Sequence, residues 1–150
     1  MAVPTKQSEN TLRLRRTFAA PREKVFQAWT DPAALKQWWC MEGYETPLVE
    51  VDLRVGGSYR IGMRKLPDGE VFHVSGTYKE IRPAEKLVYT WWWDNEPDFP
   101  ETLVTVEFRA QGNSTELWLT HELLSTGKMR EEHQKGWNIC LDRVGAFLAR

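Results

Sequence analysis

The C-terminal part of the chain, residues 115–150, places the strongest constraint on the fold. Residues 115–122 alternate between apolar and polar side chains, a pattern typical of a strand with one buried face. After a short break the chain continues as a long amphipathic segment. With each residue set about 100° beyond its neighbour, four apolar residues fall within about 60° of Trp137: Cys140, Leu141, Val144 and Leu148. This pattern predicts a long terminal helix, and the hollow of a curved sheet would bury its apolar face.

Two residues of the predicted helix do not fit a plain amphipathic pattern. His133 lies about 40° from Trp137 by the same count. It is either a helix-start histidine near solvent or bonded to a backbone carbonyl, or a polar group that faces a cavity. Gly136 in mid-helix costs about 1 kcal/mol relative to Ala, which close approach of the helix to the sheet would offset; simple tolerance is the alternative. The charged residues are expected on the solvent side: Glu131, Glu132, Lys135, Asp142 and Arg143.

The preceding residues predict a strand, two short helices and then six strands. Residues 11–18 alternate as a first strand, and Pro21 opens a helix that extends to Trp29. Asp31 before Pro32 is typical of a helix start and predicts a second helix to Trp39, closed by a break around Glu42. Short turn-forming segments then separate six extended stretches, which favours antiparallel neighbours: 45–53, 58–65, 70–81, 87–93, 103–110 and 115–122.

Length and charge indicate one domain and exclude several classes of partner. A chain of 150 residues can bury one core, which we expect in residues 10–150 behind a flexible start, residues 1–9. The 20 Lys and Arg against 21 Asp and Glu leave no basic face for nucleic acid. No apolar run has the length of a signal peptide or membrane span, so we expect a cytoplasmic protein with no membrane partner. Cys40 and Cys140 are then expected as buried free thiols, with a disulfide between them as the alternative.

The sequence contains no motif for catalysis, for a metal or for a cofactor. The three histidines form neither a His-x-x-x-His nor a His-Glu-x-x-His element, so we predict no metal site and no cofactor. There is no Gly-x-Ser-x-Gly elbow, and Gly56-Gly57-Ser58 lacks the lysine of a phosphate-binding loop. A catalytic group assembled from residues distant in sequence remains open.

Strand alternation directs several candidate residues toward the inner face. His121 has the parity of Leu119 and should point inward, either as a hydrogen-bonded core histidine or as a ligand contact. Tyr59 and Met63 share a face opposite two arginines that are expected in solvent. Eight Trp are present, and the three at 91–93 must divide between the two faces. Trp93, with the acidic loop 94–99, is a candidate for a cavity mouth.

Several stretches resemble one known family. They are residues 20–32 (APREKVFQAWTDP), 35–39 (LKQWW), 52–59 (DLRVGGSY), 76–83 (GTYKEIRP), 115–121 (TELWLTH) and the pair Gly136-Trp137. In this order they resemble homologues of the activator of the heat-shock-protein-90 ATPase, which belong to the SRPBCC superfamily with START lipid-transfer domains and the birch pollen allergen. The resemblance covers roughly residues 10–150.

The resemblance implies an α+β helix-grip fold. In that fold a curved antiparallel sheet of six to seven strands wraps a long C-terminal helix, with two short helices after the first strand. It also implies a cavity between sheet and helix, often large enough for an apolar or amphipathic small molecule. The eukaryotic activator has an additional N-terminal domain that contributes to chaperone binding; 150 residues leave no room for it, so a chaperone partner is not expected.

We therefore predict a small-molecule binding protein without an assigned reaction, whose ligand is apolar or aromatic. The residues expected to line its cavity are Tyr59, Met63, Trp93, His121, His133, Trp137 and Cys140. One alternative is a cyclase-like or hydratase-like enzyme in which His121 or His133 moves a proton. Another is a protein-interaction or co-chaperone-like module, including a homodimer, that uses exposed aromatics such as Trp92 or Phe99.

Overall fold

The alternating segments form seven antiparallel strands in one sheet in the computed structural model, which describes residues 10–40 and 43–150. The strands are β1 (Leu12–Phe18), β2 (Tyr44–Val51), β3 (Ser58–Lys65), β4 (Val71–Arg82), β5 (Lys86–Trp93), β6 (Thr102–Gln111) and β7 (Ser114–Glu122). The helices are α1 (Arg22–Thr30), α2 (Pro32–Trp38) and α3 (Gly127–Leu148).

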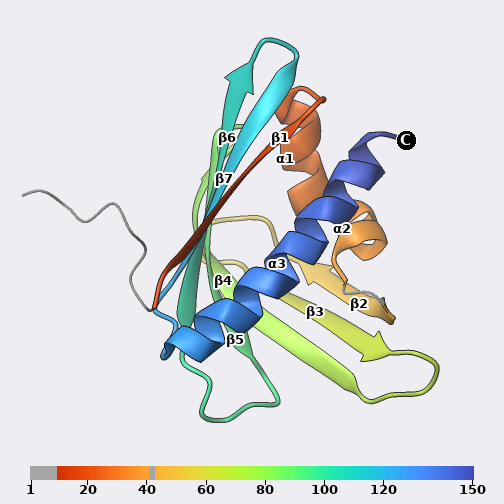
Figure 1. Ribbon diagram of the computed structural model, residues 1–150, viewed down its shortest axis with the longest axis vertical. Coiled ribbons are helices and arrows are strands. Elements are labelled where there is room, and N and C mark those ends of the chain that lie inside the picture. The colour runs from red at the N-terminus through yellow and green to blue at the C-terminus, as the bar shows by residue number, and fades with distance from the viewer. Residues whose placement is uncertain (1–9, 41–42) are drawn as a thin grey trace, which may run out of the picture.

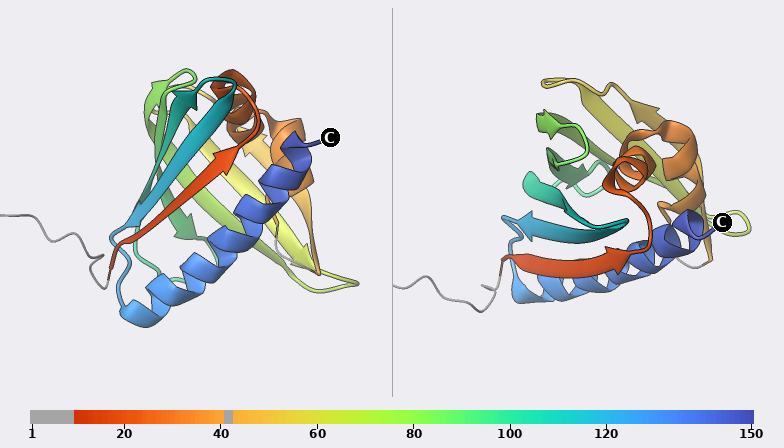
Figure 2. Two further views of the ribbon diagram at one scale, coloured as in Figure 1. Left: turned by 45° about the horizontal axis from the view of Figure 1, so that its top comes forward. Right: turned by 90° about the horizontal axis from the view of Figure 1, so that it is seen from above.

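The sheet order β1-β7-β6-β5-β4-β3-β2 makes consecutive strands neighbours from β2 to β7. The connection from β1 to β2 crosses from one edge of the sheet to the other, and it contains α1 and α2. The strands curve around α3, which lies across the hollow face (Figures 1 and 2). Register shifts in β2 between Glu45 and Leu48, and in β4 between Tyr78 and Glu80, are of the kind that bends strands. The predicted helix-grip fold is confirmed.

Local signals explain where the helices begin. The Asp31 side chain accepts a hydrogen bond from the backbone N–H of Ala33 at 3.1 Å, with Pro32 at the first helical position, as the sequence predicts. Pro21 is the capping residue of α1 and precedes its first helical residue, so this helix begins one residue later than expected. Thr126 caps α3 through a 3.1 Å bond from the Met129 N–H.

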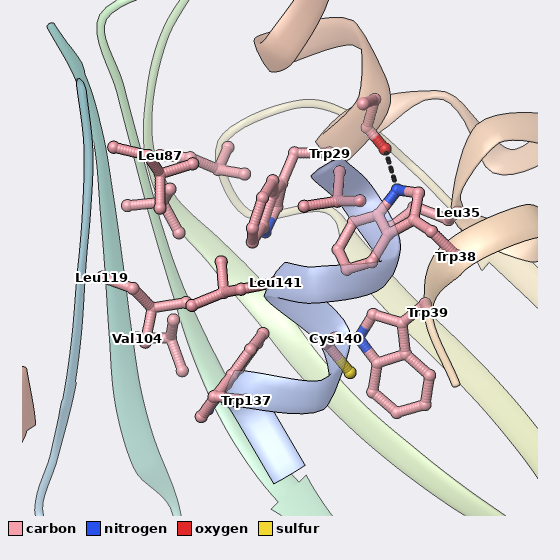
Figure 3. Close-up of a cluster of buried hydrophobic side chains, with 14 of the residues drawn as sticks. Trp29, Leu35, Trp38, Trp39, Leu87, Val104, Leu119, Trp137, Cys140 and Leu141 are labelled. Atoms are coloured by element: carbon pink, nitrogen blue, oxygen red, sulfur yellow. Dashed lines mark hydrogen bonds between the residues drawn. The ribbon is translucent and has the colours of Figure 1, made fainter. Parts of the chain in front are cut away.

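The core lies between the sheet and the three helices (Figure 3). The buried residues of α3 are those of the predicted stripe: Trp137, Cys140, Leu141, Val144 and Leu148. The indole N–H of Trp38 donates to the Ala28 carbonyl at 2.8 Å and joins the two short helices. At backbone level α3 approaches β1 on one side and α1 and α2 on the other, so it spans the concave face between them.

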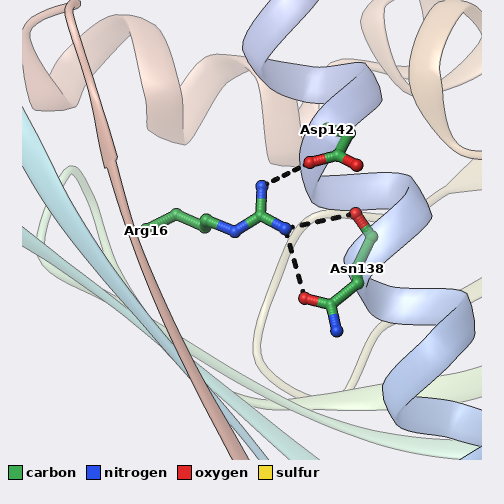
Figure 4. A network of polar contacts seen from close by, with 3 residues as sticks. All are labelled: Arg16, Asn138 and Asp142. Atoms are coloured by element: carbon green, nitrogen blue, oxygen red, sulfur yellow. Dashed lines mark hydrogen bonds and ion pairs between the residues drawn. The ribbon is translucent and has the colours of Figure 1, made fainter.

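Polar side chains attach α3 to both of these neighbours. Arg16 of β1 donates to the Asp142 carboxylate at 2.7 Å and to the side-chain oxygen of Asn138 at 3.2 Å (Figure 4). Arg143 donates through Nε to the Trp38 carbonyl at 3.1 Å, at the end of α2. Arg143 lies outside the buried stripe, as expected, but it is half-buried because its guanidinium binds the carbonyls at the end of α2.

The remaining expectations concern the first residues, the break at Glu42 and membrane spans. The flexible start, residues 1–9, and the break at Glu42 lie outside the described residues. Within residues 10–40 and 43–150, no helix is both long and apolar enough to cross a membrane.

Candidate functional site

A cavity of about 330 Å³ lies between α3 and the sheet. Its wall consists mainly of aromatic and sulfur-containing side chains: Trp39, Cys40, Met63, Trp91, Trp93, Phe99, Met129, His133, Trp137 and Cys140. Gly136 and two carboxylates, Glu96 and Glu132, complete the lining. The mainly apolar lining and few polar groups are typical of a small-molecule site.

One wall is a single stripe of α3. Met129, His133, Trp137 and Cys140 recur every three to four residues and therefore share one side of the helix. Gly136 lies within the same stripe and adds no side chain to the space. Glu132 was expected on the solvent side; it is exposed but also reaches the edge of the cavity.

The opposite wall comes from β5, the loop after it and the end of α2. Trp91 and Trp93 have the same strand parity and both face inward, whereas Trp92 lines a separate groove with Arg60. The Trp91 ring lies 5.2 Å from Trp137 and 5.7 Å from Trp39, measured between centroids. Three elements distant in sequence thus bring their indoles together at Trp91.

His133 binds protein partners through both ring nitrogens. Its Nδ1 lies 2.8 Å from the Met129 carbonyl, which can only accept, so Nδ1 carries the proton. Its Nε2 then accepts the indole N–H of Trp93 at 3.1 Å. Burial lowers the pKa of His133, opposed by the hydrogen bond to Met129 and by the charges of Glu132 and Glu96. The ring is therefore neutral and fixes the Trp93 indole. His133 thus combines two alternatives from the sequence: it is bonded to a backbone carbonyl and it also lines the cavity.

His121 forms the centre of a second, fully buried chain of hydrogen bonds. The Trp137 indole N–H donates to its Nδ1 at 3.1 Å. Its Nε2 lies 2.7 Å from the Thr102 hydroxyl, which donates at 2.7 Å to the Trp91 carbonyl. Because that hydroxyl proton is committed, His121 Nε2 must be the donor. Burial and the neighbouring His133 lower the pKa of His121, so it is also neutral.

The structure separates the seven predicted site residues into two groups. Five of them line the cavity: Met63, Trp93, His133, Trp137 and Cys140. His121 lies behind Trp91 and Trp137, with ring centroids 5.5 and 6.3 Å away, and is not part of the lining. Tyr59 lies deeper, beside a void of about 20 Å³, and donates to the Thr90 carbonyl at 2.6 Å. Burial raises the pKa of Tyr59, so its hydroxyl stays protonated.

Trp39, Trp91 and Met129 are the main lining residues that the sequence analysis did not select. Strand parity relative to Trp93 could have identified Trp91, and helical spacing from His133 could have identified Met129. Trp39 follows the last residue of α2, and nothing in its local sequence relates it to the sheet. Phe99, considered as an exposed interaction residue, instead packs 5.5 Å from the His133 ring.

Both cysteines are buried. The Cys140 thiol lies 3.6 Å from the Cys40 carbonyl, and burial raises its pKa to about 12. A disulfide between them, the alternative left open by the sequence, is not present. In the part of the chain that the structure describes, no group of three or more His, Cys, Asp or Glu residues could hold a metal ion.

Comparison with known proteins identifies the family. The model of the family "Activator of Hsp90 ATPase homolog 1-like protein" matches residues 19–149. The chain belongs to this family. No curated protein matches it.

Solved structures of the family have the same fold. A protein from Chromobacterium violaceum is 28% identical, with a TM-score of 0.86 over 95% of this chain and 99% of its own. The AHSA1 protein from Silicibacter pomeroyi is 31% identical, with a TM-score of 0.82 over 93% of this chain and 97% of its own. An HSP90 activator from Plasmodium falciparum is 29% identical, with a TM-score of 0.73 over 93% of this chain and 96% of its own.

Proposed function

We propose that this family member binds an apolar or aromatic small molecule in the cavity between α3 and β5. The observation that carries the proposal is a preformed space of about 330 Å³ whose wall is mostly aromatic. Such a wall offers a large apolar contact area to a ligand that has at least one ring.

The hydrogen bonds of the two histidines favour binding over acid–base catalysis. A general base needs a lone pair within reach of a substrate proton. The acceptor nitrogen of His133 is occupied by Trp93, and that of His121 by Trp137. The remaining nitrogen of each ring donates to a protein oxygen. Neither ring offers a free nitrogen to a bound molecule unless these bonds break.

Titration with 2-naphthol, followed through the indole N–H resonances in ¹H–¹⁵N NMR spectra, tests the proposal. We expect shifts of Trp91, Trp93 and Trp137, because these indoles line the cavity. Met129→Trp should fill the space and abolish binding. Lys128→Trp, at the neighbouring exposed position, is the matched control and should bind normally. Shifts confined to residues outside the lining would refute the site.

A chaperone-activating role is the second candidate, supported by the family match and by the name of the Plasmodium falciparum relative. The test is the ATPase rate of Hsp90 with and without this protein. A rate increase that Met129→Trp does not alter would separate this role from the cavity. An unchanged rate would argue against it.

A further inference from the structure

The mouth of the cavity carries negative charge without a basic counterpart. Glu96 and Glu132 belong to its lining, and no Lys or Arg does among the residues described. The loop between β5 and β6, residues 94–101, contains three further carboxylates and no basic residue. One of these, Asp94, binds Arg60 at 3.1 Å.

The basic residues of α3 nearest the cavity are not part of its lining. Lys128 and Lys135 lie on the opposite side of the helix, whereas half-buried Arg130 lies about 20° from Trp137 by helical position, beside the lining stripe. His133 and His121 are neutral, for the reasons given above. Glu96 and Glu132 line the cavity together with His133, and their charges act on its ring.

The aromatic wall also favours a positively charged ligand. The faces of indole rings carry partial negative charge, and Trp is the strongest aromatic partner for a cation. Trp39, Trp91, Trp93 and Trp137 together with Phe99 surround the space. A substituted ammonium group is weakly hydrated and can contact such rings, whereas an anion would meet the carboxylates of the mouth.

We infer that the ligand is an organic cation: an apolar or aromatic body that occupies the indole-lined space, with a substituted ammonium group at the mouth near Glu96 and Glu132. This inference rests on the proposed binding function and defines the charge of its ligand.

Three probes of similar shape test the sign of the charge separately from binding itself. They are benzyltrimethylammonium, its neutral carbon isostere neopentylbenzene, and the anion phenylmethanesulfonate. Each is titrated at low ionic strength, and the dissociation constant is taken from the indole N–H shifts. We expect the cation to bind at least about tenfold more tightly than the anion. The double variant E96Q/E132Q should reduce that ratio several-fold and leave the neutral probe within about twofold of its original affinity.

Glu131→Gln is the matched control, since Glu131 lies on the same helix and outside the lining. It should leave the preference for the cation unchanged. If the neutral probe binds but the protein binds the anion as tightly as the cation, or more tightly, the inference about charge is overturned and the binding function is retained. If none of the three probes shifts a lining indole, both proposals fail.

Discussion

Thr102→Val is predicted to destabilise the protein although it replaces a buried Thr in a strand with a residue of nearly the same shape. Thr102 and His121 are both fully buried, and their 2.7 Å bond satisfies the His121 Nε2–H. Valine would leave that N–H without an acceptor and would also remove the bond to the Trp91 carbonyl. A buried donor that loses its partner costs about 1–3 kcal/mol.

The net effect follows from setting this cost against what valine contributes. Its added apolar contact and strand preference offset at most about 1 kcal/mol. We therefore expect a decrease of about 2 kcal/mol in the free energy of unfolding, equivalent to about 4–8 °C in Tm for a domain of this size. Thr102→Ser keeps the hydroxyl and should lose only about 1 kcal/mol for the missing methyl.

Urea unfolding followed by Trp fluorescence measures the free energy. Thr120→Val is the matched control: Thr120 lies one residue from His121, with a half-buried side chain on the other face of β7. It should change stability by no more than about 0.5 kcal/mol. In ¹⁵N spectra of the imidazole ring, the wild type should show the Nε2–H tautomer of His121. A Thr102→Val protein as stable as the wild type, or a wild-type Nδ1–H tautomer, would refute the hydrogen-bond chain.

Acid should destabilise the protein through its two buried histidines. Folding lowers the pKa of His121 and His133 and holds both rings neutral. Below pH ~6.5 the unfolded chain therefore binds more protons than the folded chain. The free energy of unfolding is thus retained above pH ~6.5 and decreases as the pH falls below it. Each histidine contributes at most about 1.4 kcal/mol per pH unit, and His133→Gln should reduce the slope measured by urea unfolding; an unchanged slope would contradict this. Burial raises the pKa of Cys140 to about 12, so iodoacetamide at pH 8 should label this thiol only after urea unfolds the chain, as measured by intact mass. Rapid labelling of the native protein would contradict the burial. Arg16→Ala should lower the free energy of unfolding by up to about 1 kcal/mol, because it removes the contact between β1 and α3. Arg54→Ala removes only a local exposed pair with Asp52 and should lower it by less. Equal decreases for the two variants would count against the role of Arg16.

Periodicity was sufficient to predict which side chains point inward. The angle count on α3 selected the residues that are buried, and strand parity required the three tryptophans of β5 to divide between the two faces, as they do. These predictions succeed because they depend only on the geometry of one element at a time. The antiparallel pairing of β2 to β7 was likewise accessible, since short turns favour antiparallel neighbours, whereas the pairing of β1 with β7 was not.

The depth of each inward residue was not accessible in this way. Tyr59 and Met63 share a face of β3, yet Met63 lines the cavity and Tyr59 lies beside the smaller void. Trp39 and Trp91 line both spaces and therefore stand between them. The position of Trp39 depends on how the β1-to-β2 crossover returns to the sheet edge, which is a property of the packed chain. The same holds for His121, whose partners come from β6 and α3.

The histidines explain why the abundance of tryptophan does not close the space. Trp93 and Trp137 each donate their indole N–H to a neutral imidazole, at 3.1 Å in both cases. Rotation of either ring into the cavity would break that bond and leave a donor without a partner, at a cost of about 1–3 kcal/mol where the site is buried. The dispersion energy gained by rings that rotate into the cavity would have to exceed this cost. That gain is small because two flat rings fill a space of about 330 Å³ poorly. His121 and His133 therefore act on the cavity through the indoles that they fix, a role that requires their neutral forms.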